Sequence, residues 1–218
     1  MTRQSSAAGK TPLDYKKAYP ELYLPKAAPQ LIEIPPMRFL CVDGQGAPEG
    51  EDYQQSVELL YTLSYTIKMS KLDQSVVIPG YEAYVVPPLE GLWEGVKADF
   101  LPDRAQWRWT SLIRQPDFVD EGVLAWALAK AKQKHGRLDF SRVRLTSFTE
   151  GLCVQMMHRG PYAGEAQTIE KIRAFIAENG LIDRCQEDGR HHEIYLSDPR
   201  RTKAENLRTV LRHPVRRP

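Results

Sequence analysis

The chain alternates between segments of two hydrophobic periods. Apolar residues recur every three or four positions in some stretches, which predicts amphipathic helices. These stretches are 51–69, 121–136 and 163–180. Segments rich in β-branched and aromatic residues, bounded by glycine and proline, are typical of strands. These segments are 31–46, 81–93, 106–119, 141–162, 191–199 and 206–215. In the first of them, Pro35 and Pro36 predict an edge strand or two short strands.

The predicted elements repeat along the chain. The order strand, helix, strand, strand occurs once within about 31–119 and again within about 141–215, with helix 121–136 between the two copies. The copies are separated by about 115 residues, well outside the period of solenoid repeats. The sequence therefore predicts an α+β fold of two pseudo-symmetric βαββ repeats, with antiparallel sheets that frame a central ligand cleft.

The two copies also share a local pattern. The segment "YEAYVVPP" places Glu82 and Tyr84 two positions apart, and "HEIYLSDP" does the same with Glu193 and Tyr195. Residues two apart share one face of a strand. We therefore expect each pair to lie on one face of its strand.

The composition is that of an ordinary globular protein, with 218 residues of which 42% are hydrophobic and 27% charged. This length suits one large domain or two closely packed halves. Residues 1–28 are rich in small, polar and proline residues, so we expect a partly disordered arm followed by a folded domain over 29–218.

Charge and cysteine usage exclude several classes of protein. The net charge is +2, and basic residues are dispersed among acids except near the C-terminus, so nucleic acid is not an expected partner. The three cysteines, Cys41, Cys153 and Cys185, match no metal-ligand spacing, and an odd number argues against a disulfide framework. No apolar run is long enough for a membrane span or a leader segment, which predicts a cytoplasmic protein without a membrane partner.

Several segments together carry a family resemblance. The second half contains "EGLCVQMMHRGPY", "AQTIEKIRAFIAENG" and "HHEIYLSDPRRTKAENLRTVLRHPV". These segments resemble the GyrI-like small-molecule-binding family, which is also the ligand-binding fold of multidrug-sensing transcription activators. The first half contains "YTLSYTIKM", "PPLEGLW" and "IRQPDFV", which resemble the stand-alone branch of that family. The residues before the first strand lack a helix-turn-helix pattern, which favours a free-standing binder or enzyme.

The resemblance implies a cleft with Glu193 at its base and aromatic side chains on its walls. Similar proteins bind lipophilic, often cationic aromatic compounds, and some stand-alone members hydrolyse the strained cyclopropane of DNA-alkylating natural products. Physical chemistry is consistent with both roles. A delocalised cation offsets the cost of an ionised carboxylate in an apolar site, and a carboxylate whose pKa is raised there can act as a general base toward water.

Glu193 and Trp93 are the candidate catalytic residues, and both also belong to the candidate ligand-binding set. The other ligand-binding candidates are aromatic residues and one methionine: Tyr61, Tyr65, Tyr84, Trp107, Trp109, Met156, Tyr162 and Tyr195. For the aromatic residues, the alternative interpretation is ordinary hydrophobic packing. For Glu193 the alternative is an exposed strand residue paired with Arg208, because buried unpaired carboxylates are rare.

No metal and no cofactor are expected. His191 and His192 are adjacent on a predicted strand and point opposite ways, and neither they nor His158 complete a familiar ligand set. Nucleotide-binding glycine loops, GxSxG and HExxH are absent from the sequence. Three classes of function remain: a drug-binding protein, a cofactor-free hydrolase of electrophilic aromatic compounds, and a protein-interaction module of the gyrase-inhibitor type. The sequence does not specify an oligomeric state.

Overall fold

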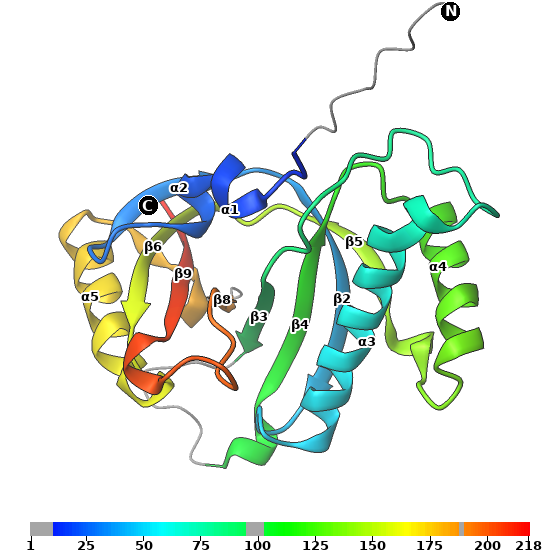
Figure 1. Ribbon diagram of the computed structural model, residues 1–218. Coiled ribbons are helices and arrows are strands. Elements are labelled where there is room, and N and C mark those ends of the chain that lie inside the picture. Colours follow the sequence, from blue (N-terminus) through cyan, green and yellow to red (C-terminus); the bar gives the residue numbers. More distant parts are fainter. Residues whose placement is uncertain (1–10, 95–102, 188–189) are drawn as a thin grey trace, which may run out of the picture.

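A computed structural model describes residues 11–94, 103–187 and 190–218 of the chain (Figure 1). It confirms the α+β class, with antiparallel strands and helices interleaved along the sequence. The helices are α1 (Tyr15–Ala18), α2 (Pro20–Tyr23), α3 (Glu51–Lys68), α4 (Glu121–Lys134) and α5 (Glu165–Glu178). The strands are β1 (Gln30–Ile34), β2 (Met37–Gln45), β3 (Leu89–Glu94), β4 (Arg108–Gln115), β5 (Arg144–Phe148), β6 (Gly151–Arg159), β7 (Ile182–Asp183), β8 (His191–Tyr195) and β9 (Arg208–Arg216).

The strands form one continuous sheet in the order β1-β6-β9-β8-β3-β4-β2-β5, with the short β7 paired to β9. The first copy contributes β2, α3, β3 and β4, and the second contributes β6, α5, β8 and β9. The copies meet at the antiparallel pair β3 and β8, where Gly91 lies opposite Glu193. The pseudo-symmetric halves therefore share a single sheet, and their junction passes through Glu193.

One strand beside each copy in the sequence pairs with a strand of the other copy. β1 precedes the first copy but pairs with β6 of the second, whereas β5 precedes the second copy but pairs with β2 of the first. Pro35 and Pro36 separate β1 from β2, so the segment 31–46 forms two strands. Proline cannot donate to a strand ladder, which explains why the strand breaks at this point.

Helices α3 and α5 cover one face of the sheet, each over its own half, and α4 packs against α3 (Figure 1). The apolar side chains beneath α3 and α4 form one core cluster, and those between α5 and β6 form another. On the opposite face, the described part of the N-terminal arm completes a third cluster with the buried Tyr15, Leu22 and Tyr23. Residues 11–28 are thus packed on the sheet, while residues 1–10 of the predicted arm lie outside the described residues.

The predicted strand 81–93 is much shorter than expected. Only β3, from Leu89, is a strand, and the preceding segment forms a single bridge between Leu13 and Tyr84. The backbone of this segment hydrogen-bonds to Leu13 of the arm instead of to a sheet neighbour. The expectation that "YEAYVVPP" and "HEIYLSDP" form equivalent strands is therefore wrong. The second segment contains β8, but the strand of the first copy that pairs with β8 is β3, which follows "YEAYVVPP" in the chain.

None of the helices in the described ranges is both long and apolar enough to cross a membrane.

Candidate functional site

Strand β8 presents different side chains to the two faces of the sheet. Side chains alternate along a strand, so His191, Glu193 and Tyr195 lie on the face covered by α3 and α5. His192 and Ile194 lie on the opposite face, where Ile194 belongs to the core cluster closed by the arm. Because β8 is in the middle of the sheet, both faces are buried, and Glu193 is only 8% exposed.

Aromatic rings from both halves gather beside Glu193. Tyr53 of α3 stacks on Trp93 of β3 at 5.7 Å between ring centroids, and meets Trp109 of β4 edge-on at 5.0 Å. Trp107 lies edge-on to Trp93 at 5.9 Å. Tyr162, which begins the 3-10 turn before α5, lies edge-on to Tyr195 at 6.1 Å. We call these residues the aromatic cluster: Tyr53, Trp93, Trp107, Trp109, Tyr162 and Tyr195.

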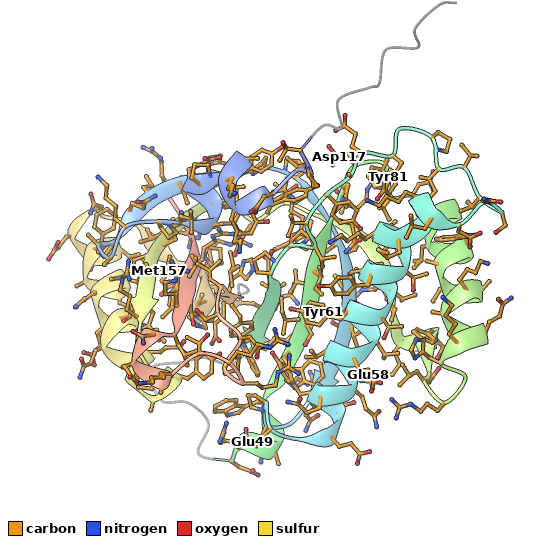
Figure 2. All side chains as sticks on the ribbon, viewed as in Figure 1. Glu49, Glu58, Tyr61, Tyr81, Asp117 and Met157 are labelled. Carbon is orange, nitrogen blue, oxygen red and sulfur yellow. The ribbon has the colours of Figure 1, made fainter. Side chains whose placement is uncertain are left out.

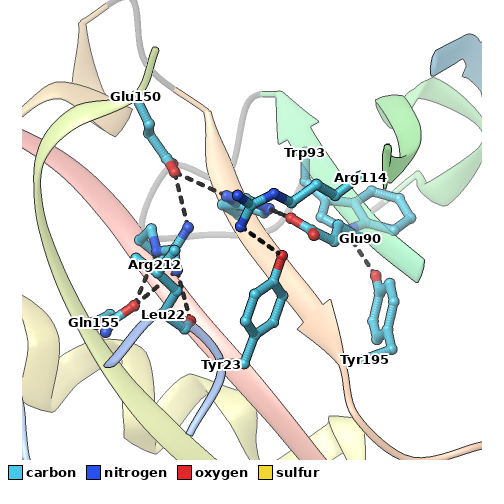
Figure 3. Close-up of polar contacts among 10 residues, drawn as sticks. Leu22, Tyr23, Glu90, Trp93, Arg114, Glu150, Gln155, Tyr195 and Arg212 are labelled. Atoms are coloured by element: carbon cyan, nitrogen blue, oxygen red, sulfur yellow. Dashed lines mark hydrogen bonds and ion pairs between the residues drawn. The ribbon is translucent and has the colours of Figure 1, made fainter. Parts of the chain in front are cut away.

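A hydrogen bond joins the two halves of the aromatic cluster. Trp93 Nε1 donates to Tyr195 Oη at 3.1 Å, across the junction of β3 and β8 (Figure 3). Gly91 makes this contact possible, because a Cβ at that position would lie 2.9 Å from Trp93 Nε1 and 3.0 Å from Tyr195 Oη. The glycine directly opposite Glu193 in the strand register thus leaves room for this hydrogen bond between the two aromatic side chains.

The charge of Glu193 acts on the tyrosines around it. Burial raises the pKa of Tyr195 well above its ordinary value, and the negative charge of Glu193 raises it further. Burial and Glu193 also raise the pKa of Tyr53, which hydrogen-bonds to Tyr195. Both phenols therefore stay protonated at neutral pH and serve as hydrogen-bond donors beside the carboxylate.

A second carboxyl group lies in the same environment. Glu165, the first residue of α5, is 5% exposed, and its Oε1 has no hydrogen-bond partner. Burial, together with the negative charge of Glu193, raises the pKa of Glu165 to about 10. Two nearby buried carboxyls avoid ionising together, so Glu165 is neutral at pH 7. Within the described residues, no arginine or lysine forms an ion pair with either glutamate.

Two histidines extend from Glu193 toward the short strand β7, which pairs with the C-terminal end of β9. His191 Nε2 lies 3.3 Å from Glu193 Oε1, and His191 Nδ1 lies 3.0 Å from His213 Nε2 on β9. His213 Nδ1 in turn lies 2.9 Å from Asp183 Oδ2 on β7. The side chains of both histidines are fully buried, and that of Asp183 is 11% exposed. Hydrogen bonds join His191, His213 and Asp183, whereas His191 Nε2 has no hydrogen-bond partner among the described residues and only contacts Glu193. We call these four residues the carboxylate–histidine chain.

Asp183, Cys185 and His213 are also close enough to hold a metal ion, with ligand-type atoms within 4.8 Å of one another. However, His213 Nδ1 and Asp183 Oδ2 are hydrogen-bonded to each other, and burial raises the pKa of the Cys185 thiol. A protonated thiol is a poor metal ligand. These groups satisfy one another, and we assign Asp183 and His213 to the carboxylate–histidine chain.

The opposite face of β8 carries a charged network of different character. His192 contacts Glu150 Oε2 at 3.0 Å through Nδ1 and Glu90 Oε2 at 2.9 Å through Nε2. Arg212 donates to Glu150, to Gln155 and to the backbone carbonyl of Leu22 in α2 (Figure 3). This network therefore contains its own cations and ties the N-terminal arm to the sheet.

The structure brings together most of the predicted aromatic residues but not all. Tyr61 and Tyr65 stack on each other at 6.2 Å along α3, where Figure 2 marks Tyr61, and Tyr65 is 50% exposed. Tyr84 is buried with the N-terminal arm and donates to the carbonyl of Ser64, away from the aromatic cluster. Met156 of β6 packs under α5, two strands from Glu193.

The alternative interpretation of Glu193 as a surface residue paired with Arg208 is wrong. Arg208 is exposed at the start of β9, and its backbone amide donates to Ser197. Glu193 is buried and contacts His191 instead. The register places Thr209, not Arg208, opposite Tyr195.

Sequence reasoning missed the roles of Tyr53, Glu165 and the other members of the carboxylate–histidine chain, which are His191, His213 and Asp183. The sequence gives Tyr53 no signal beyond its place on the apolar face of helix 51–69, and it presents His191 only as a metal ligand without a complete ligand set. Glu165 gave a weak signal, because an acidic residue in the first turn of a helix is ordinarily a surface feature. Asp183 and His213 come together only through the pairing of β7 with β9.

Comparisons with known proteins identify the relationship. The model of the GyrI-like small molecule binding domain matches residues 125–216. A crystal structure of a hydrolase from Listeria innocua is 46% identical, covers 94% of this chain and 100% of its own, and has a TM-score of 0.86. An uncharacterized conserved protein from the same organism is 48% identical over the same shares, with a TM-score of 0.88. None of the curated proteins compared with the chain matches it.

A more distant neighbour shows the same fold. The C-terminal domain of EcmrR is 13% identical, with a TM-score of 0.51 over 87% of this chain and 98% of its own. The match to the GyrI-like small molecule binding domain is what identifies a small-molecule-binding class of domain over residues 125–216. The chain belongs to the GyrI-like family.

Proposed function

We propose that the protein binds bulky, lipophilic aromatic compounds, preferentially cations, against Glu193 and the aromatic cluster. The observation that carries this proposal is a buried carboxylate that lies among aromatic rings and has no arginine or lysine partner within the described residues. The partners follow from this chemistry: small lipophilic molecules, with no cofactor required for binding.

The preference for a lipophilic cation follows from solvation. A small hydrated cation would lose its water on entering an apolar site, whereas a delocalised aromatic cation is weakly hydrated and gains contacts with ring faces. Tyr53 and Trp93 offer stacked faces, and Tyr195 offers a hydroxyl. Glu193 supplies the opposite charge, while Glu165 stays neutral at pH 7 and does not add a second charge to the empty site.

The test is a titration with tetraphenylphosphonium and with triphenylphosphine oxide, a neutral molecule of related shape. Trp93, Trp107 and Trp109 report on the site through intrinsic fluorescence, because they lie in the aromatic cluster. We expect the wild type to prefer the cation and Glu193→Gln to bind it about 10- to 100-fold more weakly, which corresponds to about 1.4–2.7 kcal/mol. Binding of the neutral molecule should change little.

Glu94→Gln is the matched control, since Glu94 is exposed at the end of the neighbouring strand β3. It should bind the cation like the wild type. Equal affinity of the wild type and Glu193→Gln for tetraphenylphosphonium would refute the proposal.

Hydrolysis is the second candidate function, favoured by the Listeria innocua relative, which is described as a hydrolase at 46% identity. In this proposal Glu193 accepts a proton from water as the water oxygen bonds to a carbon of a strained ring conjugated to a carbonyl. The ring C–C bond breaks, and its electron pair moves to the carbonyl oxygen, which takes a proton from the Tyr195 hydroxyl. The Tyr195 oxygen then regains a proton from the protonated Glu193, which restores both groups. Trp93 positions Tyr195 by donating to its oxygen.

Mass analysis after incubation with a cyclopropane-bearing aromatic electrophile tests this second function. A product heavier by one water with the wild type, and absent with Glu193→Gln, supports hydrolysis. An unchanged compound that nevertheless binds to the wild type supports the binding role alone.

A further inference from the structure

The two histidines of the carboxylate–histidine chain form a hydrogen-bonded series that begins at Asp183. His213 Nδ1 lies 2.9 Å from Asp183 Oδ2, and His213 Nε2 lies 3.0 Å from His191 Nδ1. Burial tends to raise the pKa of Asp183, but its hydrogen bond to His213 lowers the pKa overall, so the carboxylate is ionised. Burial lowers the pKa of His213, so this ring is neutral at pH 7. Because an ionised carboxylate only accepts hydrogen bonds, His213 carries its one proton on Nδ1.

This order of protons determines the tautomer of His191. His213 Nε2 has no proton and accepts a hydrogen bond, so His191 Nδ1 is the donor between the two rings. A neutral imidazole has one N–H, and in His191 that N–H is used at Nδ1. His191 Nε2 therefore carries a lone pair. Asp183, which is two hydrogen bonds away, thus makes His191 Nε2 an acceptor.

The lone pair of His191 Nε2 lies beside the candidate binding carboxylate. Nε2 is 3.3 Å from Glu193 Oε1 and has no hydrogen-bond partner among the described residues, although His191 is only 1% exposed. Trp93 of the aromatic cluster lies directly opposite His191 in the strand register, and the side chains of such a pair share one face of the sheet. An ionised Glu193 and a neutral His191 thus place two acceptor atoms side by side next to aromatic rings, and neither atom can donate to the other.

We propose that His191 Nε2 and Glu193 together accept the N–H groups of an aromatic cation, so that the site selects cations with N–H donors over cations without them. Asp183 and His213 are positioning residues in this proposal, because they hold His191 in its accepting tautomer. The inference rests on the proposed function and names its ligand class. Aromatic amidinium ions belong to this class, since their two parallel N–H groups can reach two neighbouring acceptors. A cation without N–H leaves a buried acceptor unsatisfied, which costs affinity.

Asp183→Asn should reverse the order of protons without a change of shape. Asp183 Oδ1 accepts from the backbone amide of Cys185 at 2.9 Å, whereas Oδ2 faces His213. An asparagine keeps its oxygen on the amide of Cys185 and therefore presents its NH2 group to His213 Nδ1. His213 then donates through Nε2, and His191 keeps its proton on Nε2, where it points at Glu193. The variant thus has a donor where the wild type has an acceptor.

Calorimetric titration at pH 8 with two aromatic cations measures the selectivity. The first is 4-phenylbenzamidinium, and the second is its N,N,N′,N′-tetramethyl derivative, which has the same charge and rings but no N–H. We expect the wild type to bind the first about tenfold more tightly, which corresponds to about 1.4 kcal/mol. Asp183→Asn and His191→Asn should bind both with similar affinity, because neither offers an acceptor at the Nε2 position. The two cations differ in size equally for every protein, so the change in the affinity ratio is the readout.

Asp139→Asn is the matched control. Asp139 caps a 3-10 turn as Asp183 does, but its side chain hydrogen-bonds to Ser141 rather than to a histidine. This variant should keep the tenfold ratio. A ratio near one in the wild type, or a ratio near ten in Asp183→Asn, would overturn the inference. If the wild type binds both cations equally and Glu193→Gln weakens both, the proposed function stands and only this inference fails.

Nitrogen-15 spectra of the histidine rings test the positioning role without a ligand. At pH 8, His191 should be protonated at Nδ1 only in the wild type and at Nε2 only in Asp183→Asn, with its signals assigned by His191→Asn. A proton on His191 Nε2 in the wild type would sink the inference even if both cations bind. Absence of cation binding with the expected spectra would refute the ligand class and leave the control of the tautomer by Asp183 intact.

Discussion

Adjacent histidines on β8 serve two centres that differ in one physical respect. His192 faces Glu150 and Glu90, and Arg212 adds a permanent positive charge to that network. His191 faces Glu193, and no arginine or lysine among the described residues pairs with this carboxylate. The network on the face covered by the N-terminal arm, which we call the arm-side network, is therefore balanced and structural. On the face covered by the helices, Glu193 lacks such a partner in the described ranges, as the proposed binding of a cation requires.

The pKa values show the same contrast. Burial tends to raise the pKa of the Glu150 carboxyl, but His192 and Arg212 reverse this and lower it to about 2. Glu165 on the other face has no such cation, and burial raises its pKa to about 10. Equal burial thus gives opposite shifts, because only one face supplies compensating charges. We conclude that partner charge, rather than depth in the fold, separates the ionised Glu150 from the protonated Glu165.

Among the predicted changes, removal of Arg212 from the network around His192 should lower the stability of the fold the most. Arg212→Met leaves Glu150 buried with less compensation and also removes the bond to Leu22. The free energy of unfolding should fall by about 3–5 kcal/mol in urea titrations. Arg208→Met on the same strand is exposed and should change it by less than about 0.5 kcal/mol. Equal effects of the two variants would show that the network is not structural.

The second largest effect is expected from acid, which should reduce the stabilisation that Glu150 contributes to the arm-side network. The folded-state pKa of Glu150 is about 2, below its ordinary value of 4.5, so its stabilisation is present above pH 4.5 and is lost as the pH falls toward 2. This loss should amount to about 2–4 kcal/mol. The pKa of His192 is raised, so its contribution is full below 6.5 and fades as the pH rises through the raised value. Unfolding free energies of the wild type and Glu150→Gln between pH 3 and 8, compared pairwise, check this dependence.

Glu165→Gln should increase the free energy of unfolding, whereas the loss of Arg212 or of the Glu150 charge decreases it. The folded protein keeps a proton on Glu165 that the unfolded chain loses above pH 4.5, so stability falls as the pH rises from 4.5 toward about 10. Glutamine avoids this cost, and the variant should be more stable than the wild type by about 1–3 kcal/mol at pH 8. The gain should shrink at pH 4 in thermal or urea unfolding. A loss of stability at pH 8 would contradict the proposed environment of Glu165.

The smallest effect is expected at Gly91. A methyl group there would come within 3.0 Å of both polar ring atoms, so Gly91→Ala should push Trp93 and Tyr195 apart. Binding of tetraphenylphosphonium should weaken about tenfold, or about 1.4 kcal/mol. Gly122→Ala in α4, where the nearest atom belongs to an exposed aspartate, should leave binding unchanged. Unaltered binding in Gly91→Ala would show that the hydrogen bond between the rings does not shape the site.

Much of the fold followed from the pattern of the chain. The three long helices and most strands have clear periods, so the α+β class was predictable. The resemblance to the GyrI-like family came from particular segments, such as "EGLCVQMMHRGPY" and "PPLEGLW". The strand positions of Glu193, Trp93 and Trp109 were predictable as well. The interest in Glu193 as a site residue came from the resemblance. Tyr84 was misplaced because its segment has strand-like composition but pairs with the arm.

The sequence by itself determined which residues alternate across β8, and hence that His191 and His192 face opposite ways. Only the tertiary structure decided which of the two faces has cations. Arg212, Glu150 and Asp183 lie on other strands and loops, and they reach β8 through pairings between segments distant in the chain. Charge balance in a buried site depends on such long-range pairings, and no local pattern encodes them.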